Sequence, residues 1–176
     1  MKHFLVVVDI QKDFVDGSLG TAEAVAILEN AAAKIKAFQG EIFVTFDTHF
    51  ENYLDTAEGE KLPVPHCIAG TDGWQLHEKI AAALEDIPYT PAKKLTFGSV
   101  ELPELIRQAA AGEDFDVTLI GLCTDICVVS NALILKANFP EKEICVDAAC
   151  CAGVTPQSHD AALTTMQMCQ IRVENA

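Results

Sequence analysis

Cys127 follows the run FDVTLIGLCTDI, in which an apolar strand pattern changes to a helical pattern. The β-branched stretch 117–122 is typical of a buried parallel strand, and the polar pair Thr124-Asp125 favours a helix N-cap. We therefore expect Cys127 in the first turn of a helix, where free N–H groups and the helix dipole lower the pKa of a thiol. A thiolate there can attack a carbonyl carbon, and the same N–H groups can bind the resulting oxyanion. The alternative is that Cys127 is a small buried hydrophobe, as free cysteines commonly are.

Two further candidates follow strand ends elsewhere in the chain. Asp9 closes the run HFLVVVD, and Lys94 ends a short strand expected near 88–93. The carboxyl ends of parallel strands line one crevice, so Asp9, Lys94 and Cys127 can converge there. A carboxylate can take the proton of a thiol and pass it to a leaving amine, while an ammonium group stabilises the thiolate. Taken singly, Asp9 could cap a loop and Lys94 could be a solvated surface lysine.

A second group of residues has the chemistry of a metal site. Asp47 ends the strand EIFVTFD, and His49 comes two residues later, so both side chains can face the same side. His66 lies in the long loop 48–72 that follows. One carboxylate and two imidazoles suit Zn²⁺, Fe²⁺ or Mn²⁺, with positions left open for a ligand. The alternative is two loop histidines that only form hydrogen bonds.

Strand and helix patterns alternate along the whole chain. Strands are expected at 3–9, 41–47, 88–93, 115–122, 141–147 and 171–173, and helices at 22–38, 74–84, 103–111, 125–138 and 155–169. This order predicts an α/β fold with a mostly parallel sheet of about six strands and helices on both faces. The 176 residues suit a single three-layer domain that spans 1–176.

Composition narrows the classes of partner and the cellular location. A net charge of −14 argues against nucleic acid, which needs clustered lysine and arginine. No apolar run is long enough to cross a membrane, and the N-terminus does not have the pattern of a signal peptide, so we expect a cytoplasmic protein. The seven cysteines are an odd number without a CxxC pair, which favours reduced thiols.

Four stretches carry a family resemblance: VVVDIQKDF, DTHF with PHCIAGT, KLTFGS and GLCTDICV. In this order they resemble the isochorismatase-like cysteine hydrolase superfamily, and within it the nicotinamidase/pyrazinamidase branch. The resemblance implies the isochorismatase-like hydrolase fold and a catalytic triad of Asp9, Lys94 and Cys127. It also implies a cis peptide between Leu122 and Cys123, and an oxyanion hole formed by the backbone N–H groups of Cys123 and Cys127.

The same resemblance implies a metal that binds the ring nitrogen of the substrate. The family has a fourth protein ligand between the positions that match His49 and His66, and no histidine stands there in this chain. Glu58 is our choice for this ligand, with Glu60 as the alternative. We expect one divalent transition metal, zinc before iron or manganese. Two phenylalanines, Phe14 and Phe97, match positions that pack around the substrate, although core packing would also explain a single phenylalanine.

These expectations combine into a cysteine amidohydrolase acting on a small-molecule amide, with nicotinamide as the expected substrate. One alternative is another carbon–nitrogen hydrolase of the superfamily, acting on N-carbamoyl or ureido compounds. An alternative of another class is a non-catalytic redox or metal-binding protein, suggested by the cysteines and the Asp/His loop. The apolar composition and the resemblance also favour a homo-oligomer.

Overall fold

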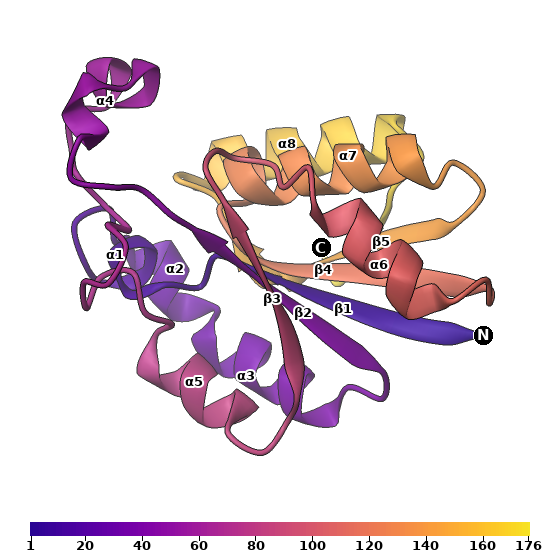
Figure 1. Cartoon of the computed structure of the whole chain (residues 1–176). Coiled ribbons are helices and arrows are strands. Elements are labelled where there is room, and N and C mark those ends of the chain that lie inside the picture. Colours follow the sequence, from indigo (N-terminus) through magenta and orange to yellow (C-terminus); the bar gives the residue numbers. More distant parts are fainter.

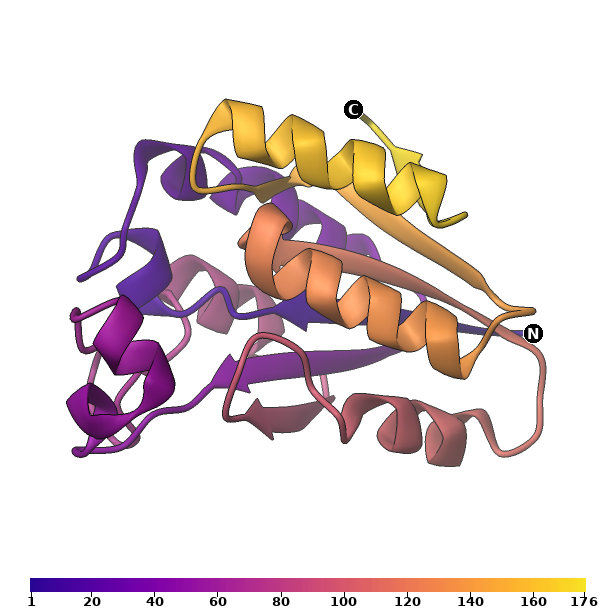
Figure 2. The same cartoon turned by 90° about the horizontal axis from the view of Figure 1, so that it is seen from above.

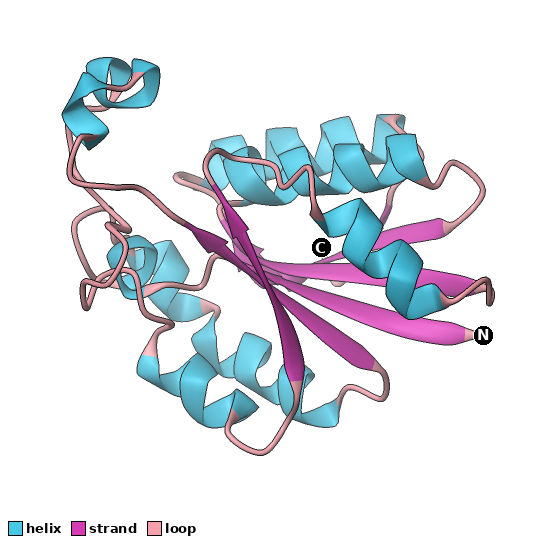
Figure 3. Cartoon of the chain, in the orientation of Figure 1, coloured by secondary structure: helices cyan, strands magenta, loops and turns pink.

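The computed structural model describes all residues from 1 to 176. Six parallel strands form one sheet in the order β3-β2-β1-β4-β5-β6 (Figures 1 and 3). The strands are β1 (Lys2–Val8), β2 (Glu41–Asp47), β3 (Tyr89–Lys94), β4 (Phe115–Leu122), β5 (Glu143–Ala152) and β6 (Arg172–Glu174). The chain builds outward from β1 to β3 and then returns to the other side of β1 with β4. Open parallel sheets bind ligands at such a reversal, beyond the carboxyl ends of the two central strands.

Helices cover both faces of the sheet, as the alternating pattern predicts. They are α1 (Lys12–Val15), α2 (Ala22–Ala26), α3 (Leu28–Ala37), α4 (Ala57–Lys61), α5 (Glu78–Leu84), α6 (Leu102–Ala110), α7 (Val129–Asn138) and α8 (Pro156–Met168). The helices α6, α7 and α8 lie on one face and α3 and α5 on the other, while the short α4 projects beyond the strand ends (Figures 1 and 2). No helix combines the length and the apolar composition that crossing a membrane requires.

Each face of the sheet has its own hydrophobic core because side chains alternate along a strand. In β1, Phe4, Val6 and Val8 belong to the core beneath α6, α7 and α8. Leu5 and Val7 belong to the core against α2, α3 and α5. Burial on both sides explains why residues 4–8 of β1 are all apolar. All seven cysteines are free thiols.

Several predicted boundaries differ from the structure. The helix expected at 22–38 is divided at Ile27 into α2 and α3. The helix expected from 74 begins only at Glu78, because Gln75 and Leu76 pair with the backbone at 11–12 and His77 caps the helix. Two segments expected as loops contain the short helices α1 and α4, and β5 runs five residues past its predicted end at 147.

Candidate active site and metal centre

The segment that carries Cys127 leaves the sheet through an unusual backbone path. Gly121 has φ of 121°, and a Cβ at this position would lie 2.1 Å from the carbonyl oxygen of Val8, so the close approach of β4 to β1 requires glycine. The next peptide, between Leu122 and Cys123, is cis, as the family resemblance implies. Cys127 then lies in a π-helical turn, Thr124–Val128, which precedes α7. The structure therefore has Cys127 in the first helical turn after the strand, as predicted, and this turn is π-helical rather than α-helical.

The prediction that Thr124 and Asp125 cap the helix was wrong. The hydroxyl of Thr124 forms a hydrogen bond with Nδ1 of His159 at 2.8 Å, and Asp125 accepts from the backbone N–H of Val154 at 3.2 Å. Neither side chain caps the turn. The backbone N–H of Cys123 donates no hydrogen bond within the protein. This donor is therefore free to bind an oxygen atom of a ligand.

Asp9, Lys94 and Cys127 meet beyond the ends of β1, β3 and β4. The Lys94 ammonium lies 2.6 Å from Asp9 Oδ2 and donates to Cys127 Sγ at 3.6 Å. Asp9 is fully buried and accepts from the hydroxyl of Thr45 at 2.6 Å through its other oxygen. Its backbone has φ of 46°, a left-handed conformation that turns the chain away from the strand. The three side chains are thus close enough to exchange protons and charge.

Burial controls the charges of this cluster. It raises the pKa of Cys127 well above the ordinary thiol value, and the neighbouring Asp9 raises it further. The low thiol pKa expected from a helix N-terminus was therefore wrong for the free protein. Burial raises the pKa of Asp9 as well, although Lys94 opposes this. Burial would lower the pKa of Lys94, but Asp9 and Cys127 outweigh it and raise that pKa, so Lys94 stays charged. The one ammonium group of this cluster therefore faces two acidic groups of the proposed triad, Asp9 and Cys127, whose pKa values are both raised.

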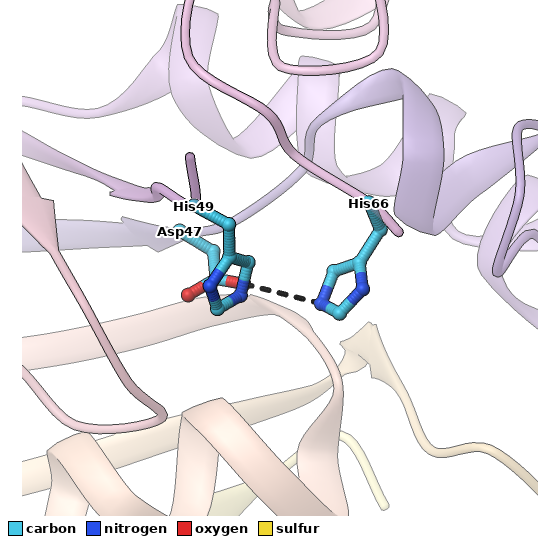
Figure 4. Close-up of side chains that lie close together, drawn as sticks. All are labelled: Asp47, His49 and His66. Carbon is cyan, nitrogen blue, oxygen red and sulfur yellow. Dashed lines mark hydrogen bonds and ion pairs between the residues drawn. The ribbon is translucent and has the colours of Figure 1, made fainter. Parts of the chain in front are cut away.

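The second group of side chains lies next to this cluster. Asp47, His49 and His66 present one ligand atom each, all within 4.8 Å of one another (Figure 4). Asp47 Oδ2 is 3.0 Å from His49 Nε2 and 3.5 Å from His66 Nε2. The Nδ1 of His66 bonds to the carbonyl of Val64 at 2.8 Å, which leaves its Nε2 available for a ligand.

Glu58 faces the two imidazoles, whereas Glu60 does not. The Oε1 atom of Glu58 is 3.7 Å from Nε2 of both His49 and His66, and Glu60 is exposed. Thr56 caps α4 by accepting from the N–H of Gly59, which places Glu58 in the first turn of this short helix. Two nitrogen and two oxygen donors that converge in this way fit a zinc-type divalent cation.

Asp47 joins the two groups, a link that the sequence did not indicate. Its Oδ2 faces the histidines while its Oδ1 accepts from Lys94 at 3.1 Å. Burial would raise the pKa of Asp47, but the two histidines and Lys94 lower it, so it stays ionised. Gln11 fixes this strand end, since its amide bonds to both the N–H and the carbonyl of Asp47 at 2.8 and 2.9 Å.

Other buried polar residues position the site and were not predicted. Asn131 donates to the carbonyl of Cys127 at 2.8 Å and to that of Phe97 at 3.2 Å, and it accepts from Ser99 N–H. The Tyr53 ring contacts both imidazoles, with ring centroids 4.8 and 5.0 Å apart. The sequence pattern gave no signal for Asn131, because the buried face of α7 carries Asn131, Ala132 and Leu135.

A cavity of about 250 Å³ opens onto both groups. Its lining includes Cys123 and Cys127 as well as Asp47, Glu58 and His66. Phe14 and Phe97 also line it, so the two phenylalanines chosen from the sequence lie in its wall. Phe97 is 44% exposed and Phe14 packs against the His66 ring. The lining of the cavity is therefore largely apolar and includes both the thiol of Cys127 and nitrogen and oxygen donors.

Comparison with known proteins gives the family. The isochorismatase domain matches residues 3–175. An uncharacterised isochorismatase family protein, PncA of Bacillus subtilis (strain 168), is 30% identical over 146 residues, which cover 76% of this chain and 78% of that protein. The nicotinamidase/pyrazinamidase of Mycobacterium tuberculosis is 26% identical over 184 residues, with 96% of both chains covered.

A solved structure agrees along nearly the whole length. The crystal structure of a pyrazinamidase/nicotinamidase from Streptococcus mutans UA159 superposes with a TM-score of 0.85 and 27% identity. The alignment covers 98% of this chain and 99% of that chain. This chain therefore belongs to the isochorismatase family, in the branch that holds the nicotinamidases.

Proposed function

We propose that this protein is a nicotinamidase, an amidohydrolase that converts nicotinamide to nicotinate and ammonia through a thioester at Cys127. The observation that carries the proposal is the position of the Lys94 ammonium. It lies 2.6 Å from Asp9, 3.1 Å from Asp47 and 3.6 Å from the Cys127 sulfur. One cation thus contacts a carboxylate, a thiol and a member of the proposed metal-ligand set at the same cavity. The thiol and carboxylate suit an amide, and the metal ligands suit a ring that contains nitrogen. The names of the relatives from Mycobacterium tuberculosis and Streptococcus mutans support the same substrate.

The first half-reaction forms the thioester. Cys127 Sγ attacks the carboxamide carbon while Asp9 accepts the thiol proton. The N–H groups of Cys123 and Cys127 would bind the oxyanion, the role that the unpaired N–H of Cys123 permits. Asp9 then donates its proton to the leaving nitrogen, the carbon–nitrogen bond breaks, and ammonia departs. Lys94 stays charged throughout and holds Asp9 in place.

The second half-reaction uses the same residues with water. Asp9 takes a proton from a water molecule that attacks the thioester carbonyl, and the carbon–sulfur bond then breaks. Cys127 recovers its proton from Asp9, and the product acid gives the remaining water proton to the solvent as nicotinate leaves. One carboxylate can serve as base and then as acid because the proton that it takes in each half-reaction is the proton that it then gives back.

Asp47, His49, Glu58 and His66 are the residues that would hold the divalent cation. When bound, the cation would supply a Lewis acid that accepts the pyridine nitrogen and orients the ring. Phe14 and Phe97 would pack against the ring. Zinc fits the mixed nitrogen and oxygen donors, and iron and manganese are the alternatives.

The decisive experiment measures ammonia release from nicotinamide by the purified, metal-loaded protein. We expect turnover in the wild type, loss of turnover after chelation, and its return with zinc. Cys127→Ala removes the nucleophile and is expected to abolish ammonia release. Cys169→Ala, which removes an exposed thiol outside the site, is the control and is expected to keep it. Undiminished turnover in Cys127→Ala would refute the mechanism. Activity on N-carbamoyl compounds without activity on nicotinamide would assign the other branch of the superfamily.

A redox function has less support. Six of the seven thiols are buried or half-buried, and burial raises the pKa values of Cys123 and Cys145 to about 12 and that of Cys150 to about 11. Thiols of this kind are slow to form thiolate and to exchange.

A further inference from the structure

The turn that carries the nucleophile is held from outside by the start of α8. Thr124 is fully buried, and its hydroxyl has one partner, Nδ1 of His159 at 2.8 Å. The next residue, Asp125, accepts from the backbone N–H of Val154. Two consecutive residues of the turn are therefore tied to a segment about thirty residues later in the chain.

The position of His159 is itself well determined. Thr155 caps α8 by accepting from the N–H of Ser158, and the N–H of His159 donates to the carbonyl of Thr155 at 3.0 Å. Gly153 lets the chain pass close to this helix, since a Cβ there would lie 2.9 Å from the backbone nitrogen of His159. The imidazole is thus presented to Thr124 by a capped helix end rather than by a loose loop.

Thr124 lies between the two proposed oxyanion donors. It directly follows Cys123 and precedes Cys127 by three residues, and the carbonyl of Cys123 accepts from the N–H groups of Ile126 and Val128. A rotation at Thr124 would tilt the Cys123 carbonyl and the turn that is hydrogen-bonded to it. The hydrogen bond to His159 opposes this rotation on the side away from the substrate.

We propose that His159 is a positioning residue of the nicotinamidase reaction, which acts through the Thr124 hydroxyl to hold the Cys123 and Cys127 N–H groups where the oxyanion forms. The inference rests on the proposed function and adds to it a residue remote from the substrate. His159 does not line the substrate cavity; it lines a separate cavity of about 240 Å³ with Cys151 and Gly153. Its loss is therefore expected to affect the transition state more than substrate binding.

Thr124→Val and His159→Phe each remove the hydrogen bond while keeping the side-chain shape. We expect each to lower kcat for nicotinamide about 10- to 100-fold with KM changed by less than about twofold, the effect of a small displacement of oxyanion donors. The double variant is expected to be no worse than the poorer single variant, because both remove the same contact. His159→Asn can place an amide oxygen near the position of Nδ1 and is expected to recover most of kcat. Asp160→Asn, at the next and exposed position of α8, is the control.

A binding measurement separates positioning from a loss of stability. Pyridine-3-carboxaldehyde is an aldehyde analogue to which the Cys127 thiol adds across the carbonyl, with formation of a carbon–sulfur bond and transfer of the thiol proton. Its affinity is expected to fall by the same factor as kcat in Thr124→Val and His159→Phe, whereas nicotinate affinity and bound zinc stay unchanged.

Three results would overturn the inference. The first is a rise in KM with kcat unchanged. The second is a loss of kcat in the double variant that equals the sum of the single losses and parallels the fall in melting temperature. The third is equal aldehyde affinity in all variants. If the wild-type protein releases ammonia and both variants release it at the same rate, the inference is refuted but the proposed function is not. A wild-type protein with no ammonia release refutes the proposed function and this inference together.

Discussion

Replacement of Lys94 by methionine removes the cation that joins the two groups of the site. The Lys94 side chain is 1% exposed and lies 2.6 Å from Asp9 and 3.1 Å from Asp47. Methionine keeps much of the volume but leaves two buried carboxylates without this partner. Breaking a buried ion pair in this way costs about 3–5 kcal/mol. For a chain of this length that corresponds to a fall of about 6–20 °C in melting temperature.

Lys93 provides a matched control on the same strand. It is exposed, and its ammonium lies 5.1 Å from the centroid of the Trp74 ring. An exposed cation–π contact contributes about 0.5–1 kcal/mol, so Lys93→Met is expected to cost no more than this. The two variants differ by one position in β3 and by the direction of the side chain.

The assay is urea unfolding of the metal-free protein, combined with ammonia release by the zinc-loaded protein. Lys94→Met is expected to lose about 3–5 kcal/mol and at least about 100-fold in kcat/KM, because the charge that orients Asp9 and faces the sulfur is gone. The reasoning is refuted if Lys94→Met unfolds within about 1 kcal/mol of Lys93→Met, or if both variants turn over nicotinamide at the wild-type rate.

Three further predictions follow from other contacts. Glu58→Ala is expected to weaken zinc binding by at least about 10-fold while Glu60→Ala does not, measured by competition with a chelator; equal affinities would remove Glu58 from the ligand set. Asn131→Leu leaves the carbonyl of Cys127 and the N–H of Ser99 without a buried partner. It is expected to lower the free energy of unfolding in urea by about 2–4 kcal/mol, whereas Asn138→Leu, on the exposed side of α7, is expected to lower it by less than about 1 kcal/mol. Burial would raise the pKa of Asp147, but Lys34 at 2.8 Å and Asn175 at 2.9 Å lower it below the ordinary value. The stability that this carboxylate contributes is therefore present above its ordinary pKa of about 3.9 and is lost as the pH falls below it. Lys34→Met is expected to reduce the stability at neutral pH and to flatten its loss on acidification, with the exposed Lys36→Met as control; identical pH profiles would exclude this role.

The fold class could be predicted from the sequence because burial on both faces of a parallel sheet leaves a direct pattern. Residues 4–8 of the run HFLVVVD are apolar without alternation, the pattern of a strand covered by helices on both sides. The strands β2 and β4 begin and end at the predicted residues. Two predicted helix boundaries were wrong. The helix expected from 74 begins at Glu78, after the N–H of His77 has donated to the carbonyl of Ile10, and the helix expected at 22–38 is divided at Ile27.

The sequence also determined which residues are chemically able to form a site. Asp9, Lys94 and Asp47 end strands, and the carboxyl ends of parallel strands share one edge. The types of residue at these ends, together with the family resemblance, were enough to select them. Which glutamate lies near the histidines, Glu58 rather than Glu60, depends on how the loop 48–72 folds.

Only the tertiary structure decided the charges of the site residues and the hydrogen bonds that position them. The pKa of Cys127 is raised because the turn is buried beside Asp9, and no local sequence pattern encodes that burial. The contact between Thr124 and His159 joins residues 35 positions apart, and Asp47 bridges Lys94 and the histidines through its two separate oxygens. Local sequence sets secondary structure through backbone and side-chain preferences, whereas electrostatics and hydrogen bonding depend on which groups the packed chain brings within a few ångströms.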